Sequence, residues 1–233
     1  MRAVAAAVAL ALSVPHGAAG AEDWANRPAA PEVQTRESQA AMTPANALER
    51  LKAGNDRFVA NTTKRRDWSA KVIATAAGQF PFAAVLACMD SRAPIEIVFD
   101  QGIGDVFGIR VAGNVVNDDE LGSLEYAVKV GAKLIVVLGH TNCGAVKGAI
   151  DHVQLGNLTG LLAKIRPAVE AAHCDDAKVE ACVTKVAEQN VAQSMKEIRA
   201  RSPYLAKALD EGKVSLAGAM YDVASGHVTF LER

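Results

Sequence analysis

The stretch Ala83-Ala84-Val85-Leu86-Ala87, followed at once by Cys88-Met89-Asp90-Ser91-Arg92, decides the fold class of this chain. A second stretch of the same kind, Leu134-Ile135-Val136-Val137-Leu138, is followed by Gly139-His140-Thr141-Asn142-Cys143-Gly144. Both runs are continuously apolar, which is typical of strands that are buried on both faces of a parallel sheet. Reactive side chains follow each run directly, at the carboxyl ends of strands, where open α/β sheets bind ligands.

The rest of the chain alternates between strand-like and helix-like segments. Further strands are predicted at 106–111, 214–221 and 227–231, and the last two are joined by the turn Ala224-Ser225-Gly226. Helices are predicted between them, over 45–59, 69–77, 95–99, 118–131, 144–150, 158–172 and 176–201. The predicted fold is therefore α/β: a mainly parallel sheet, about four parallel strands plus an antiparallel edge strand, flanked by helices.

Composition limits the classes of function. The chain has 233 residues, half of them hydrophobic, and a formal net charge of −1. This length suits one α/β domain with a sizeable core. The charge balance gives no support for a nucleic-acid partner or for adhesion to an anionic membrane.

The N-terminus has the pattern of a signal peptide over residues 1–21. Arg2 provides the positive charge, Ala3 to Val14 form a short apolar core, and Ala19-Gly20-Ala21 places small residues before a cut at Glu22. An uncleaved anchor or an Ala-rich helix is the alternative. We expect a cleaved signal, a periplasmic or secreted protein with no membrane attachment after cleavage, and a flexible leader over residues 22–42.

The main domain is predicted to span residues 43–233. Its first segment, 43–61, begins with Thr43-Pro44, an N-cap followed by proline at the first helical position. The following helix carries few apolar residues, Leu48, Leu51 and Phe58. We therefore expect this N-terminal helix to pack on a partner subunit.

Cys174 and Cys182 lie close together in a polar segment. On one unbroken helix they would be about 12 Å apart, too far for a disulfide. A helix that starts just after Cys174 would let that residue fold back. In an oxidising compartment a disulfide is then possible, and two free, half-buried thiols are the alternative.

The two motifs offer two thiols and one imidazole, from Cys88, Cys143 and His140. This ligand set is that of a zinc site with an open fourth position. Asp90 and Arg92 beside it could serve acid–base chemistry or form an ordinary surface ion pair. A Cys88–Cys143 redox couple would explain the thiols but leaves Asp90, Arg92 and His140 without a role.

The chain resembles the β-class carbonic anhydrases from about Thr43 to its C-terminus. The most specific matches are the two motifs themselves, supported by Arg110-Val111-Ala112-Gly113-Asn114 and Ser123-Leu124-Glu125-Tyr126-Ala127. The resemblance implies one Zn²⁺ per subunit, held by Cys88, His140 and Cys143. It also implies that Asp90 and Arg92 form the catalytic dyad, and that the enzyme is a homodimer or a higher homo-oligomer.

The implied reaction is the reversible hydration of CO2 to bicarbonate and a proton, through a zinc-bound hydroxide that the dyad orients. In the plant-like subgroup, residues matching Gln79, Phe107 and Tyr126 line the substrate pocket, with one wall from the neighbouring subunit. The predicted substrate-binding residues are Gln79, Phe107, Ala112, Tyr126 and Gly144. Some members close the site when the Asp becomes the fourth zinc ligand, so Asp90 is predicted to do this at low pH.

Two departures from the plant-like pattern stand out. Ala112 replaces a larger aliphatic residue, and Val130 replaces a histidine that some members use to export protons. The alternatives that keep the zinc site are action on carbonyl sulfide or carbon disulfide, and a non-catalytic zinc-binding module.

Overall fold

The computed structural model describes residues 33–231. The predicted signal peptide and residues 22–32 of the predicted leader lie outside the described residues. The helices are α1 (Arg36–Ala41), α2 (Pro44–Val59), α3 (Trp68–Thr75), α4 (Ile95–Val98), α5 (Asp118–Lys129), α6 (Gly144–Ile150), α7 (Gly156–Ala163), α8 (Arg166–Ala172), α9 (Glu180–Arg201) and α10 (Pro203–Asp210), with a 3-10 turn η1 (Ala112–Asn114). The strands are β1 (Ala83–Ala87), β2 (Val106–Arg110), β3 (Leu134–His140), β4 (Ser215–Tyr221) and β5 (Val228–Phe230).

The five strands form one sheet in the order β2-β1-β3-β4-β5. Strands β2, β1, β3 and β4 run parallel, and β5 pairs antiparallel with β4 at one edge. Both the fold class and the antiparallel edge strand predicted from the sequence are therefore confirmed.

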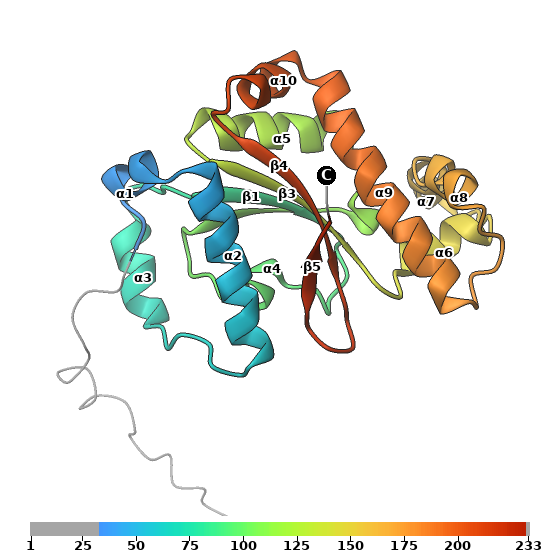
Figure 1. The fold of residues 1–233 in the computed structure, drawn as a ribbon, viewed down its shortest axis with the longest axis horizontal. Helices are drawn as coiled ribbons and strands as arrows, with labels where there is room; N and C mark the ends of the chain where they lie inside the picture. The colour runs from blue at the N-terminus through green and yellow to red at the C-terminus, as the bar shows by residue number, and fades with distance from the viewer. Residues whose placement is uncertain (1–32, 232–233) are drawn as a thin grey trace, which may run out of the picture. The chain divides into compact units, whose positions relative to one another are not determined.

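The sheet separates two layers of helices (Figure 1). On one face, alternate residues of β1 and β3 pack with Leu51 of α2 and with Val98 and Phe99 at the end of α4. On the other face they pack with α5, α6, α8 and α9. Both central strands are buried along their whole length, which explains why their sequences are continuously apolar.

The register of the central strands positions the two motifs. Ala87 pairs with Leu138, so Cys88 and His140 both emerge at the same end of the sheet, from adjacent strands. Neighbouring strands lie about 4.8 Å apart, close enough for their following side chains to converge on one point.

The predicted flexible leader is wrong for its last part. Residues Arg36–Ala41 form α1, closed by a capping box between Thr35 and Ser38. The side chain of Gln39 is buried and donates to the carbonyl oxygen of Pro81 at 2.8 Å. This contact fixes a segment whose composition alone gives little reason for order.

Contact of segment 43–61 with a partner subunit stays a prediction, and in this structure α2 packs on the sheet of its own chain. Ala47 and Leu51 are fully buried against it. Gly54 permits the close approach, since a Cβ there would lie 1.8 Å from the carbonyl oxygen of Phe99. Asn55 completes the docking by donating to the carbonyl oxygens of Val98 and Gly226.

Beyond shifts of one or two residues at helix ends, the helices differ from prediction in three further places. The single helix expected over 158–172 is broken into α7 and α8, because Pro167 has no N–H and suits only a first turn. Helix α9 starts at Glu180 rather than near residue 176. Helix α10 was not predicted, although Ser202-Pro203 repeats the cap signal of Thr43-Pro44.

The late start of α9 leaves a turn between α8 and α9, which a disulfide between Cys174 and Cys182 closes. Their Cα atoms are 5.5 Å apart, within the range a disulfide requires. The alternative of two free thiols does not hold in this structure.

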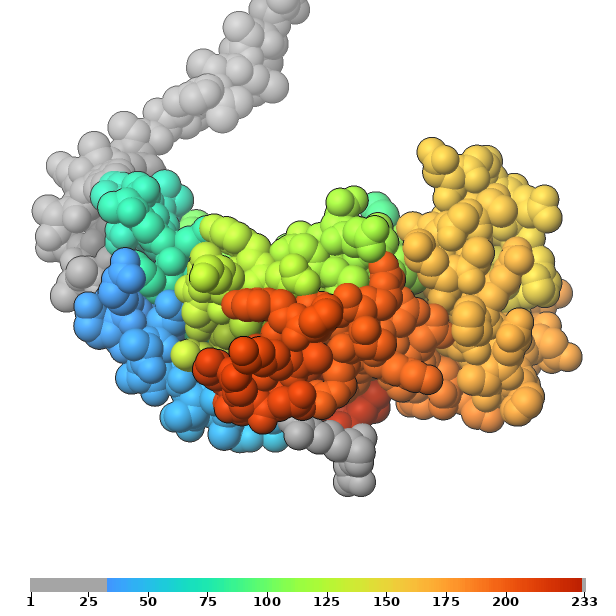
Figure 2. Space-filling model, turned by 90° about the horizontal axis from the view of Figure 1, so that it is seen from above, coloured from blue at the N-terminus to red at the C-terminus, as the bar shows by residue number. Residues whose placement is uncertain are grey.

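Figure 2 shows a surface hollowed along one side, between α3 in teal and the yellow segment of α6 and α7, with the green α5 segment between them. Among residues 33–231, no helix is both long and apolar enough to span a membrane.

Candidate metal centre

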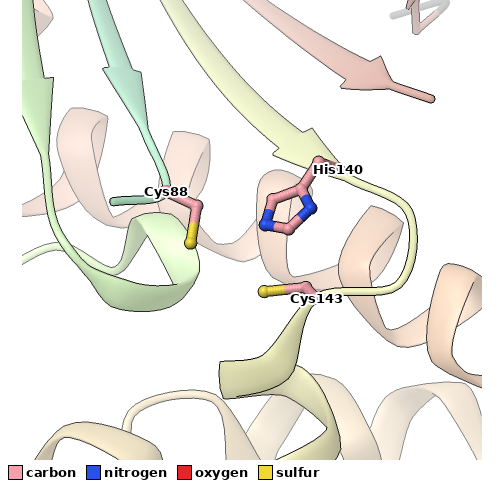
Figure 3. A group of neighbouring side chains, drawn as sticks. All are labelled: Cys88, His140 and Cys143. Atoms are coloured by element: carbon pink, nitrogen blue, oxygen red, sulfur yellow. The ribbon is translucent and has the colours of Figure 1, made fainter. Parts of the chain in front are cut away.

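Cys88, His140 and Cys143 converge at the carboxyl ends of β1 and β3. Cys88 follows β1, His140 is the last residue of β3, and Cys143 is the N-cap of α6. Figure 3 shows the two sulfur atoms and the imidazole facing a common point. Their ligand atoms lie within 4.8 Å of one another, near the spacing of about 3.7 Å that two ligands of one zinc ion adopt.

The imidazole is oriented as a ligand. Its Nδ1 lies 2.9 Å from the carbonyl oxygen of Thr141, so Nδ1 carries the proton and Nε2 keeps its lone pair. His140 is 1% exposed, and its Nε2 has no hydrogen-bond partner among the described residues. A buried nitrogen without a partner costs free energy, and a bound cation would remove that cost.

The two thiols compete for one proton. The pKa of Cys88 is lowered to about 4, chiefly because the Cys143 thiol donates a hydrogen bond to its sulfur. The pKa of Cys143 is raised, because its hydrogen is held by the Cys88 thiolate and its own sulfur is buried. Two thiolates together would repel each other, and a divalent cation between them reverses that effect. The donor set therefore fits zinc.

A backbone amide also contacts the Cys88 sulfur. The Gly113 N–H in η1 donates to Cys88 Sγ at 3.3 Å. Gly113 has φ +69°, and a Cβ at this position would lie 2.5 Å from Ile165 Cδ1. Glycine is thus required both by the backbone conformation and by the packing.

Asp90 and Arg92 form a bidentate pair beside this cluster. Arg92 Nε and Nη2 donate to the two carboxylate oxygens of Asp90 at 2.9 and 2.8 Å, and the Arg92 backbone N–H donates at 2.9 Å. The Arg92 hydrogen bonds hold the pKa of Asp90 well below its usual range, and Asp90 raises the pKa of Arg92 in return. One carboxylate oxygen lies 3.9 Å from His140 Nε2, so an ionised carboxylate faces the point where the three ligands meet.

Two residues that the sequence did not mark as functional hold the loop that carries Asp90 and Arg92. Arg110 donates to the carbonyl oxygens of Cys88 and Asp90, at 3.2 and 2.5 Å. The Tyr221 hydroxyl donates to the carbonyl oxygen of Arg92 at 3.2 Å. Arg110 belongs to a matched motif, but the residue type does not reveal that it binds backbone oxygens.

The described geometry agrees with comparisons to known proteins. Residues 83–228 match the family model described as carbonic anhydrase. Carbonic anhydrase 2 of Mycobacterium tuberculosis is 37% identical over 190 residues, covering 78% of this chain and 90% of the relative. This chain belongs to the β-class carbonic anhydrases.

Solved structures support the assignment. The β-carbonic anhydrase CafA of Aspergillus fumigatus superimposes with a TM-score of 0.65 at 30% identity, covering 71% of this chain and 86% of that one. A tetrameric β-carbonic anhydrase of Sordaria macrospora superimposes with a TM-score of 0.62 at 26% identity, covering 71% and 91%. β-Carbonic anhydrases are zinc enzymes, which agrees with the donor set described above.

The predicted substrate-binding residues of this β-carbonic anhydrase divide into two groups. Ala112 and Gly144 lie next to the metal cluster, since Ala112 precedes Gly113 and Gly144 follows Cys143. Phe107 instead pairs with Ala84, four residues before Cys88, which places it about 13 Å back along the sheet. Gln79 precedes β1 altogether.

Phe107 and Tyr126 nevertheless contact each other, with ring centroids 6.0 Å apart in an edge-to-face arrangement. Tyr126 is 55% exposed, and Gln79 is exposed as well. Within one chain, then, these three residues lie along the β2 side of the sheet, away from the metal cluster.

Proposed function

We propose that this β-carbonic anhydrase catalyses the reversible hydration of CO2 to bicarbonate and a proton. The observation that carries the proposal is the Asp90–Arg92 pair placed 3.9 Å from the Nε2 atom of a Cys-His-Cys ligand set. Family membership supplies the reaction class. A zinc ion held there would make a water molecule nucleophilic near neutral pH and polarise substrate oxygens.

Asp90 acts as the hydrogen-bond acceptor that orients the attacking oxygen. Its low pKa keeps it ionised and unable to donate, so only a group that carries a proton is held beside it. Arg92 fixes the carboxylate through its bidentate contact and prevents it from rotating. The dyad therefore contributes orientation, and the proton lost to solvent comes from the water rather than from Asp90.

We further propose that the substrate pocket is completed by a second subunit. Strand β2 is an edge strand, and its unpaired backbone groups and half-buried side chains require a cover. The exposed apolar residues of the adjacent elements, Trp68, Val72, Ile73, Ile103 and Tyr126, extend the same surface. A twofold arrangement across this side would bring Gln79, Phe107 and Tyr126 of one subunit toward the metal cluster of the other. The tetrameric Sordaria relative supports an oligomer.

The position of Asp90 beside the three ligands suggests that the metal site also has a closed state. If the contact with Arg92 were released, the carboxylate would be close enough to serve as a fourth ligand in place of water. Because acid disfavours the deprotonated water that competes for this position, low pH would favour the closed and inactive state. An activity profile that stays flat from acid to alkaline pH would count against this mechanism.

We propose export to the periplasm or the medium, on the basis of the N-terminal signal pattern. The Cys174–Cys182 disulfide supports this location, because disulfides persist in oxidising compartments. The location is tested by fractionating cells that produce the full chain and sequencing the mature N-terminus, which should be Glu22.

Carbonyl sulfide and carbon disulfide remain the alternative substrates, since Ala112 leaves more room beside the cluster than a larger aliphatic residue would. The test is to measure kcat/KM for CO2, carbonyl sulfide and carbon disulfide on one preparation. We expect CO2 to be preferred by at least about a hundredfold, or about 2.7 kcal/mol in activation free energy. A higher value for either sulfur compound would change the assigned substrate.

A further inference from the structure

Helix α9 presents two polar side chains in an otherwise apolar buried face. Asn190 is 1% exposed and Ser194 is 3% exposed, and their neighbours on this face are Val183, Val186, Ala187, Val191 and Ile198. Residues four apart lie on the same side of a helix, so Asn190 and Ser194 point in one direction. Most buried polar groups in proteins have hydrogen-bond partners.

Both partners are backbone oxygens of η1. Asn190 Nδ2 donates to the Gly113 carbonyl oxygen at 2.7 Å, and Ser194 Oγ donates to the Asn114 carbonyl oxygen at 3.0 Å. Helix α9 thereby holds the turn whose Gly113 N–H donates to Cys88 Sγ. Gly113 is fixed on both sides, with its N–H on a metal ligand and its carbonyl oxygen on Asn190.

We propose that Asn190 is a positioning residue for the metal centre, acting by holding the Gly113 carbonyl oxygen so that the Gly113 N–H stays directed at the Cys88 sulfur. The role rests on the metal-binding function assigned to Cys88, His140 and Cys143. An N–H donor reduces the charge on a ligating thiolate and fixes the sulfur in place, and outer partners of this kind tune both metal affinity and ligand electronics.

The geometry favours this role over simple packing. A packing residue on this face would be apolar, as the neighbours of Asn190 are. Gly113 is in the left-handed region with φ +69°, where its peptide planes are not held by regular helix or sheet hydrogen bonds. Without the Asn190 amide, the Gly113 carbonyl oxygen would lose its hydrogen-bond donor. If the turn rotated so that this oxygen met another donor, the Gly113 N–H would turn away from the Cys88 sulfur.

The test compares Asn190→Ala and Asn190→Asp with Ser194→Ala. The Ser194 variant is the matched control, since it removes a buried hydrogen bond from the same helix to the next residue of the same turn. We expect the Asn190 variants to bind zinc about tenfold or more weakly in competition with a chelator. Their cobalt-substituted forms should show a shifted sulfur-to-cobalt charge-transfer band, whereas Ser194→Ala should keep the wild-type band. Equal effects of the Asn190 and Ser194 variants on affinity and band would overturn the proposal.

A measurement on the unaltered chain keeps the test decisive if the variants do not fold. In the protein loaded with ¹¹³Cd, the Gly113 amide proton should show scalar coupling to the metal through the Cys88 sulfur. Absence of this coupling would contradict the proposal. None of these readouts depends on CO2 turnover, so failure of the carbonic anhydrase assignment would be seen separately, in the hydration assay.

Discussion

Among single residues, Arg92 carries the clearest prediction, because its guanidinium fixes Asp90 and keeps it ionised. Arg92→Met removes the donors that lower the pKa of Asp90, so that pKa should rise toward its ordinary value of about 3.9. A ¹³C NMR titration of the Asp90 carboxyl measures this directly. We expect kcat/KM to fall about tenfold to a hundredfold with zinc content unchanged.

Arg65→Met provides the control, since it removes an exposed guanidinium outside the cluster. An Asp90 titration that is identical in Arg92→Met and in the wild type would contradict the assigned electrostatics.

At this scale the sequence predicted residues that bear reactive side chains, and missed those that act through the backbone. Cys88, His140 and Cys143 were predictable because their spacing after two buried strands brings them together. The Gly113 amide and its Asn190 partner were not, because any residue except proline has an N–H and nothing in the spacing marks a carbonyl oxygen as buried.

Among the structural elements, a buried ion cluster at Asp100 ties α2 and the 61–67 segment to the end of α4. Its carboxylate accepts from Arg57 Nε at 2.6 Å, from the Lys64 N–H at 3.2 Å and from Arg66. The side chain of Asp100 is 1% exposed. Burial alone would raise its pKa, but the hydrogen bonds from Arg66 and Arg57 outweigh burial, and the pKa is lowered.

Asp100→Asn should destabilise the fold by about 3 to 5 kcal/mol, since it leaves the half-buried guanidinium groups of Arg57 and Arg66 without their buried charge partner. Urea unfolding measures this. Because the folded-state pKa is depressed, the contribution is fully present above about pH 4 and is lost as the pH falls through the folded-state value. The difference between wild type and variant should therefore shrink in acid.

Asp210→Asn is the matched control, because Asp210 pairs with Arg199 at the exposed surface. It should change stability by less than about 1 kcal/mol. A loss as large as that of Asp100→Asn would show that burial is not the cause.

The disulfide makes a separate prediction for the turn before α9. Replacing Cys174 and Cys182 together by serine should lower stability by about 2 to 3 kcal/mol, as expected for a short closed loop. Thermal unfolding with and without dithiothreitol measures this. The wild type should lose stability in the reductant and the double variant should not respond; a wild type that is equally insensitive would mean that the pair is not oxidised in solution.

The strands were predictable because a buried parallel strand is a short, continuous run of apolar residues. In the helices of this chain, apolar residues are interrupted by polar ones. Helix ends were less predictable. The α7–α8 break depends on one proline, and the start of α9 depends on a turn that a covalent bond closes. Segment 36–41 has a local capping box between Thr35 and Ser38, but the contact of Gln39 with Pro81 that docks it on the domain is tertiary and is not encoded in the local pattern.

For the whole molecule, the question is whether Gln79, Phe107 and Tyr126 serve the site of their own subunit or that of a partner. Asp90→Asn disables the metal side of a site, and Gln79→Ala disables the proposed outer wall. If the wall comes from the partner, a mixed dimer has one site with both defects and one intact site. Co-expression of the two variants should then restore about a quarter of wild-type activity, because half of the dimers are mixed.

If each subunit supplies its own Gln79, every site in the mixture carries one defect. The mixture would then show only the average of the two parent variants, and the shared pocket would be refuted. Size-exclusion chromatography with light scattering on the same samples should show a dimer or a larger oligomer.

We propose that Cys88, His140 and Cys143 hold a zinc ion at which Asp90 directs CO2 hydration. The most direct test is stopped-flow CO2 hydration by the chain from Glu22 onward, wild type and Asp90→Asn, with zinc determined on the same samples. We predict about one zinc per subunit in both proteins and a fast wild-type rate that Asp90→Asn lowers by about 10² to 10⁴. Zinc without any hydration rate at alkaline pH, or a wild type that binds no zinc, would contradict the claim.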